Sequence, residues 1–223
     1  MNHPLQCRCG TLKGYVVRPG MAKRAVCYCK DCQAFAHFLK RADTVLDERG
    51  GTAIVATVAK QVHFTQGLEA LACMSLSDRG LLRWYASCCN TPIGNTPRDF
   101  KTPYVGLIES CLKSNSPSLE DSFGPVRMVI NTRSARGHVK STPVSNLVAM
   151  LGIIVGDRNS PERLLQTQSL LWDRNGHAGR ASSQPYQGRA GASHKCRLTS
   201  RSTRTPRRRR WRAVRSAPVS LVR

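Results

Sequence analysis

The sequence predicts a mainly β domain with short helices, followed by a disordered basic tail. Short apolar, β-branched or aromatic runs recur from Leu12 to about Val155, and turn signals such as Pro19-Gly20 and Gly50-Gly51 separate them. Three groups of closely spaced cysteines lie within the same stretch. The composition then changes near residue 157. We therefore expect one domain over residues 1–156 and a tail over residues 157–223.

Seven segments have the pattern of strands, and two have that of helices. One expected helix covers residues 32–41, where Phe35, Phe38 and Leu39 fall at i, i+3 and i+4. The other covers the apolar residues 145–155 and closes the domain. The expected strands are LKGYVV (12–17), TAIVATVA (52–59), VHFT (62–65), LACMSL (71–76), LLRWYAS (81–87), YVGLIES (104–110) and VRMVIN (126–131).

The positive charge of the chain is concentrated in the tail. The formal charge is +22, but the 13 arginines and one lysine from Arg174 onward have no acidic residue among them. This tail is too poor in apolar residues to offset the entropy of ordering it, so we expect disorder. The segment TPRRRRWRAVR suits salt-sensitive contact with nucleic acid phosphates, with Trp211 available for stacking. Out-of-frame translation of a GC-rich gene gives the same composition, and this alternative stays open.

The first residues, MNHPLQCRCG, contain no apolar leader segment, so we expect a cytoplasmic protein with reduced cysteines. The most apolar window, residues 144–156, is shorter than the roughly 20 residues that span a membrane. We therefore expect no membrane association.

The cysteine groups indicate metal binding. Disulfide pairing within the segment CYCKDC leaves one of its three thiols over, whereas one metal ion uses all three. Thiolates at short spacing on turns select a soft or borderline ion such as Zn²⁺. Three ligands leave a position open for catalysis, but a fourth cysteine from elsewhere would make a closed structural site, and spacing leaves both possibilities open. The candidate ligands are Cys7, Cys9, Cys27, Cys29, Cys32, Cys88 and Cys89.

The order of these motifs resembles the glutathione-dependent formaldehyde-activating enzyme family, which includes centromere protein V. The resemblance rests on C-x-C-G at the start, C-x-C-x-x-C about twenty residues later, and CNTPI at residues 89–93, and it runs from about Cys7 to Val155. It implies a small, β-tent-like fold with two zinc sites. It also implies that a zinc ion on Cys27, Cys29 and Cys32 handles a thiol adduct.

The same resemblance implies a second, structural zinc held by Cys7, Cys9 and Cys89. Ala86 stands where the family has the first cysteine of a C-x-x-C pair, so one ligand is missing. Adjacent residues of an extended strand point to opposite faces, so we expect Cys88 at the edge of this site or outside it.

The function that follows from the resemblance is a carbon–sulfur lyase acting on a thiol–aldehyde adduct such as S-hydroxymethylglutathione. The alternative is a non-catalytic, zinc-stabilised binding module whose basic tail contacts nucleic acid. Redox cycling of Cys29 and Cys32 is a weaker possibility, because the βαβ context of thioredoxin-like motifs is absent. Other side chains are weaker candidates for a functional role. They are Arg24 and Lys30 as charges near the thiols, Asp31 and Glu109 as proton carriers, and His37, His63 and His138 as ligands or bases. We expect Cys73 and Cys111 to be buried residues without a functional role.

Overall fold

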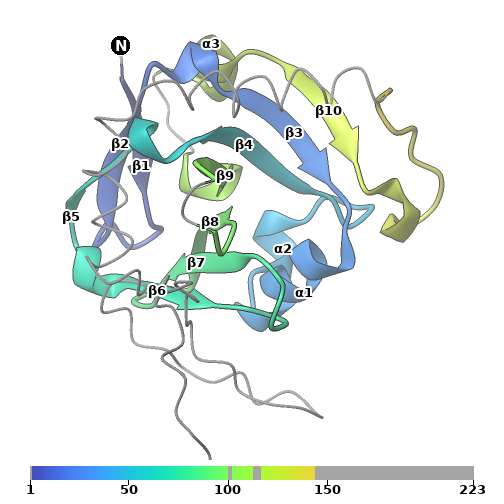
Figure 1. Ribbon diagram of the computed structural model, residues 1–223, viewed down its shortest axis with the longest axis horizontal. Helices are drawn as coiled ribbons and strands as arrows, with labels where there is room; N and C mark the ends of the chain where they lie inside the picture. The colour runs from blue at the N-terminus through green and yellow to red at the C-terminus, as the bar shows by residue number, and fades with distance from the viewer. Residues whose placement is uncertain (1, 100–101, 113–116, 144–223) are drawn as a thin grey trace, which may run out of the picture.

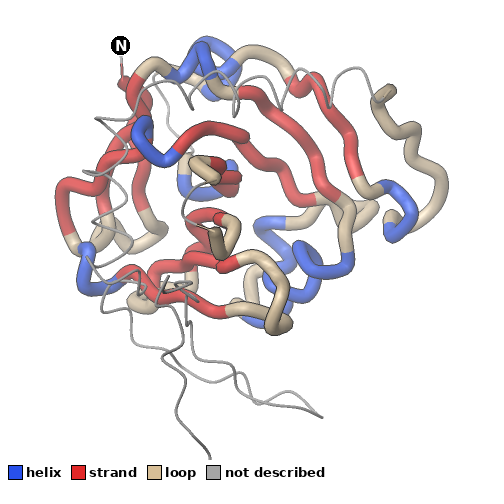
Figure 2. The backbone as a smooth tube through the Cα atoms, viewed as in Figure 1, coloured by secondary structure: helices blue, strands red, loops and turns tan. Residues whose placement is uncertain are grey.

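The computed structural model describes residues 2–99, 102–112 and 117–143, which form two β-sheets with short helices (Figures 1 and 2). The expectation of a mainly β domain is confirmed. The smaller sheet has the order β1-β2-β5, and the larger has the order β10-β3-β4-β9-β8-β7-β6. All paired strands are antiparallel except β10 and β3. The strands are β1 (Asn2–Gln6), β2 (Lys13–Val17), β3 (Lys23–Cys27), β4 (Thr52–Val58), β5 (Val62–Gln66), β6 (Leu71–Met74), β7 (Leu82–Ala86), β8 (Thr91–Thr96), β9 (Tyr104–Ile108) and β10 (Val126–Ile130).

Each of the seven expected strand segments contains a strand, but β1, β3 and β8 were not anticipated. Strand β8 has the sequence TPIGNT, in which Pro92 and Gly94 are residues that usually interrupt strands. Pro92 is accommodated where the pairing of β7 with β8 shifts register. At Gly94 a side chain would meet the neighbouring backbone, since a Cβ there would lie 3.0 Å from the Gly106 carbonyl oxygen.

The helices are short. The predicted helix over 32–41 is α1 (Lys30–Phe38), which begins earlier because Cys29 serves as its N-cap. The expected helix over 145–155 and the tail over 157–223 lie outside the described residues. No helix within the described ranges is long and apolar enough to cross a membrane. The other helices are α2 (Ala42–Val45), α3 (Leu119–Phe123), and the 3₁₀ turns η1 (Pro19–Met21), η2 (Ala59–Gln61), η3 (Leu68–Ala70), η4 (Glu109–Cys111) and η5 (Thr132–Ser134).

The large sheet buries apolar side chains on both faces. The main core lies between the two sheets and joins side chains such as Val16 of β2, Val55 of β4 and Leu107 of β9. The opposite face carries a second cluster that includes Cys27 and Ile54. Figure 1 shows α1 and α2 on the side of the large sheet away from β1, β2 and β5. The cysteines of β3 and α1 therefore lie between this sheet and α1.

A buried ion pair fixes the start of β3 against the segment after β9. The Arg24 guanidinium donates to both carboxylate oxygens of Glu109, at 2.7 and 3.2 Å, and each side chain is 11% exposed. Arg24 also donates to the Gly124 carbonyl and lies 3.8 Å from Glu120, whose side chain is 77% exposed. Because both of its oxygens are engaged, Glu109 is not available as the proton carrier suggested by the sequence.

The two carboxylates around Arg24 allow a matched test of this pair. Glu109→Gln should lower the free energy of unfolding by about 3 kcal/mol, because it leaves a buried guanidinium without its charged partner. Glu120→Gln, which changes an exposed partner of the same arginine, should cost less than about 1 kcal/mol. Urea denaturation of the two variants measures the difference. Equal losses would contradict the assignment of Glu109 as the principal partner.

Candidate metal centres

The first centre contains Cys27, Cys29 and Cys32, whose sulfur atoms all lie within 4.8 Å of one another. Cys27 is the last residue of β3, Cys29 is the N-cap of α1, and Cys32 lies in the first turn of that helix. The backbone N–H of Cys32 donates to the Cys29 sulfur at 3.3 Å, as N-capping requires. A strand that ends and a helix that begins within this short segment therefore bring the three sulfurs together.

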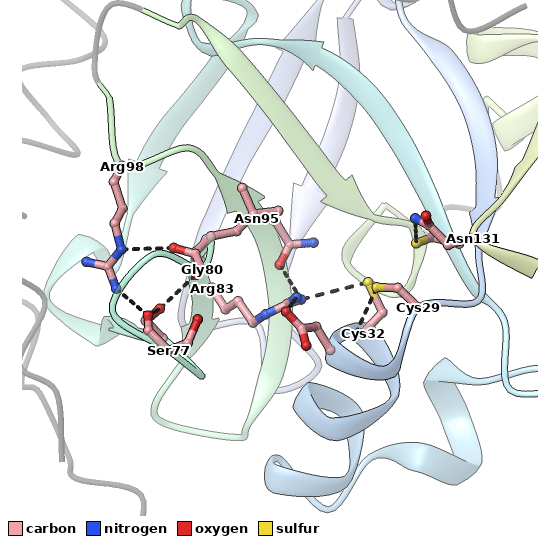
Figure 3. A network of polar contacts seen from close by, with 12 residues as sticks. Cys29, Cys32, Ser77, Gly80, Arg83, Asn95, Arg98 and Asn131 are labelled. Atoms are coloured by element: carbon pink, nitrogen blue, oxygen red, sulfur yellow. Dashed lines mark hydrogen bonds and ion pairs between the residues drawn. The ribbon is translucent and has the colours of Figure 1, made fainter. Parts of the chain in front are cut away.

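Side chains from two other strands contact the same sulfurs. The Asn131 amide, just after β10, donates to the Cys27 sulfur at 3.3 Å. The guanidinium of Arg83, on β7, contacts the Cys32 sulfur at 3.8 Å and donates to Asn95 Oδ1 on β8 at 3.1 Å. Figure 3 shows Arg83 and Asn95 reaching toward the start of α1. The centre thus draws on four strands of the large sheet and one helix.

The three thiols do not ionise alike. Hydrogen bonds from Cys29 and Cys32, aided by Asn131, lower the pKa of Cys27 to about 2. The pKa values of Cys29 and Cys32 are raised, chiefly because their thiols donate to Cys27. Burial raises the pKa of Tyr104 on β9, and the charges of Cys27 and Cys32 raise it further. The centre therefore offers one thiolate as the first ligand for an incoming cation.

The second centre contains Cys7, Cys9, Cys88 and Cys89, whose sulfur atoms also lie within 4.8 Å of one another. The sulfur–sulfur distances are 3.5 Å for Cys7–Cys9, 3.8 Å for Cys7–Cys88, 3.3 Å for Cys9–Cys88 and 3.8 Å for Cys88–Cys89. Four sulfurs placed tetrahedrally at about 2.3 Å from one ion would be roughly 3.8 Å apart. The cluster has the number of ligands and the spacing for a closed metal site.

The expectation that Cys88 lies at the edge of this site is wrong. It assumed an extended strand, but β7 ends at Ala86 and residues 87–90 form a turn. The Cys89 N–H faces the Ala86 carbonyl at 3.4 Å, and Asn90 adopts the left-handed conformation with φ 54°. Both cysteines therefore point toward Cys7. Cys88 thereby completes a group of four sulfurs without a cysteine at position 86.

Neighbouring polar groups support the four-cysteine cluster. The Leu12 N–H donates to the Cys7 sulfur at 3.2 Å. The hydroxyl and backbone N–H of Thr11 are the main reasons why the pKa of Cys9 is lowered to about 6. The Thr91 hydroxyl lies 3.0 Å from the Cys89 sulfur. These contacts favour the ionised sulfurs that bind metal.

The remaining sequence candidates lie outside both clusters. Neither cluster includes a histidine among the described residues. His63 stacks on Tyr15 in the small sheet, with ring centroids 5.2 Å apart, and His138 contributes only its carbonyl to Arg49. Cys111 is buried and free, as expected, whereas Cys73 is buried but disulfide-bonded, and Cys196 lies outside the described residues.

Asp31 is the one suggested proton carrier beside a cluster, since its carboxylate lies 3.5 Å from Arg83 Nη2. Sequence patterns did not predict that Arg83, Asn95 and Asn131 lie beside the cysteines. Arg83 could have been recognised as a buried polar residue, because it lies within the apolar run LLRWYA, where its charge must be buried or the chain must leave the sheet.

Replacement of Cys88 tests the four-cysteine assignment. Cys88→Ser should remove one bound metal ion per chain and lower stability by several kcal/mol, as should Cys7→Ser, because each leaves three sulfurs. Cys111→Ser, which changes a buried thiol outside both clusters, should retain the full metal content. Native mass spectrometry and thermal melting measure both quantities. Full metal content in the Cys88 variant would restore the expectation that this residue lies outside the site.

Comparisons with known proteins place the chain in a family of unknown function. No curated protein matches it. One solved structure that matches is the crystal structure of a Rhodobacter sphaeroides protein, a structural genomics target. It is 16% identical, with a TM-score of 0.36 over 55% of this chain and 96% of the other, which is too distant to carry an argument. Residues 1–151 match a family of unknown function, DUF6151, and the chain therefore belongs to the DUF6151 family.

Proposed function

We propose that this protein is a zinc-dependent carbon–sulfur lyase that acts on a thiol–aldehyde adduct at the three-cysteine centre. The observation that carries the proposal is the difference between the two clusters. Cys7, Cys9, Cys88 and Cys89 form a complete set of four ligands, whereas Cys27, Cys29 and Cys32 have no fourth histidine, cysteine or carboxylate within reach among the described residues. A three-ligand site with an open position is typical of catalytic zinc, and a four-thiolate site is typical of structural zinc.

The residues present fit zinc. Thiolates are ligands that Zn²⁺ binds well, and each sulfur of the three-cysteine centre accepts an N–H donor that would keep it oriented. Zinc at this position would supply a Lewis acid that stabilises, as a thiolate, the sulfur released when the carbon–sulfur bond breaks. The four-cysteine cluster would hold a second ion that ties the segment after β1 to the β7–β8 turn.

The proposed reaction is the interconversion of a hydroxymethyl thioether with a thiol and formaldehyde. In the cleavage direction the carbon–sulfur bond breaks and its electron pair goes to sulfur. The hydroxyl proton leaves as the carbonyl forms, so no oxidant or reductant is required. Asp31 is the candidate acceptor of that proton, because its carboxylate is 55% exposed and lies beside Arg83 at the start of α1. The resemblance to the formaldehyde-activating family supports glutathione as the thiol.

The test is exchange between free glutathione and its hydroxymethyl adduct, followed by NMR with formaldehyde present. The zinc-loaded protein should accelerate this exchange, and Cys29→Ser should lose one metal ion per chain and at least about 100-fold of the acceleration. Cys111→Ser serves as the control and should keep both properties.

Two outcomes would contradict the proposal. Exchange that the zinc-loaded protein does not accelerate would favour the non-catalytic binding module. Full metal content in the Cys29 variant would remove the metal assignment itself.

A further inference from the structure

Arg83 is a buried cation beside the three-cysteine centre. Its side chain is 2% exposed on β7, between β8 and the edge strand β6, and an unpaired charge is costly when it is buried to this degree. Among the described residues its one carboxylate partner is Asp31, which is 55% exposed and lies 3.5 Å away, so solvent weakens that attraction. Its other contacts are the neutral Asn95 amide, the Phe35 ring at 5.6 Å and the Cys32 sulfur at 3.8 Å. Cys32 is therefore the buried group that can offset the charge of Arg83 when a bound metal ion holds it as a thiolate.

The structure of the sheet holds the guanidinium in this place. Arg83 and Asn95 are directly paired across β7 and β8, so their side chains lie on the same face. Asn95 is paired in turn with Gly106 of β9, where the Tyr104 hydroxyl occupies the place of a side chain, 2.5 Å from the position a Cβ would take. The Asn95 side-chain oxygen accepts a hydrogen bond from Arg83 Nη1 and fixes the orientation of the guanidinium (Figure 3).

The donors around the three sulfurs differ in charge. Cys27 accepts from the Asn131 amide, Cys29 accepts from a backbone N–H, and Cys32 accepts from Arg83. Arg83 is the one cation among these three donors. A dication with three thiolates has a net charge of −1, and Arg83 brings this sum to zero when the solvent-screened charge of Asp31 is left aside. An additional thiolate would then bring the sum to −1 instead of −2, which lowers the repulsion that this thiolate meets.

We propose that Arg83 is a positioning residue that determines the ligand class of the open position. By neutralising the three-thiolate centre, it allows an anionic sulfur ligand to bind there in preference to a neutral ligand. This inference rests on the proposed function, because it requires a metal ion on the three cysteines. It adds that the thiol released by cleavage is held at the open position as its thiolate, and that Arg83 and Asp31 have opposite effects on the affinity for this thiolate.

The experiment uses the full chain loaded with Co²⁺, whose absorption reports ligand exchange. A closed four-sulfur site has no free position, so a spectral change on adding ligand reports the three-cysteine centre. 2-Mercaptoethanol serves as the thiolate probe, and imidazole serves as the neutral probe, both at one fixed pH. Arg98→Gln is the matched control, because Arg98 donates to the Gly80 and Ser77 carbonyls away from the cluster.

The variants should change the affinity for the thiolate probe in opposite directions and leave the affinity for the neutral probe nearly unchanged. Arg83→Gln should weaken 2-mercaptoethanol binding by about tenfold or more and leave imidazole binding within about twofold. Arg83→Lys should retain most of the thiolate affinity, because it keeps the charge. Asp31→Asn should tighten thiolate binding about two- to fivefold by removing an opposing charge. Arg98→Gln should change neither affinity.

Two results would overturn the inference, and they are distinguishable. If Cys29→Ser binds as much Co²⁺ as the unmodified chain, the metal assignment fails and the role of Arg83 fails with it. If Co²⁺ binds but the thiolate affinity is unchanged in the Arg83→Gln and Asp31→Asn variants, the inference alone fails. Should Arg83→Gln not fold, the exposed Asp31→Asn change decides the question.

Discussion

The close packing of ionisable sulfurs is the constraint on which the two centres depend. Seven cysteine sulfurs lie in two groups, each within 4.8 Å, and such sulfurs repel one another once ionised unless a cation binds them. The chain meets this constraint with turns: the strand-to-helix junction at Cys29 and the tight turn at Cys88 and Cys89. Each turn brings its sulfurs close to the others of the cluster, and backbone N–H groups of Cys32 and Leu12 donate to the Cys29 and Cys7 sulfurs. A metal ion at either cluster would therefore be coupled to the local fold.

Helix α1 connects the two centres physically. It begins at the three-cysteine centre, and Arg41, shortly after its end, donates to the Cys89 carbonyl at 2.8 Å. Between these ends, Phe35 and Phe38 contact the Tyr85 ring of β7 at centroid distances of 6.5 and 6.1 Å. The helix is thus held against β7, the strand that also carries Arg83. The four-cysteine cluster lies at the end of the same strand, so a metal ion bound there would stabilise the strand and helix that position the three-cysteine cluster.

The two faces of the large sheet differ in their side chains. The face toward the small sheet contains the main apolar core. The opposite face carries Cys27, Arg83 and Asn95, whose polar groups contact one another or the other cysteines. Buried polar groups of this kind are tolerated only when they are paired, so the sheet can hold them rigidly next to the three-cysteine cluster.

The sequence by itself determined the fold class, the seven strands with continuous apolar patterns, and the grouping of cysteines into metal-binding motifs. These properties depend on residues close together in the chain, where periodicity and motif spacing are informative. Local patterns failed at β8, whose Pro92 and Gly94 suit a strand only because of the register of β7 and the proximity of Gly106. They failed at Cys88 because the alternation of a strand does not hold in the turn that follows β7. Only the tertiary structure decided that Arg83, Asn95 and Asn131 surround Cys27 and Cys32, because pairing between distant strands places a side chain on a face and next to a partner.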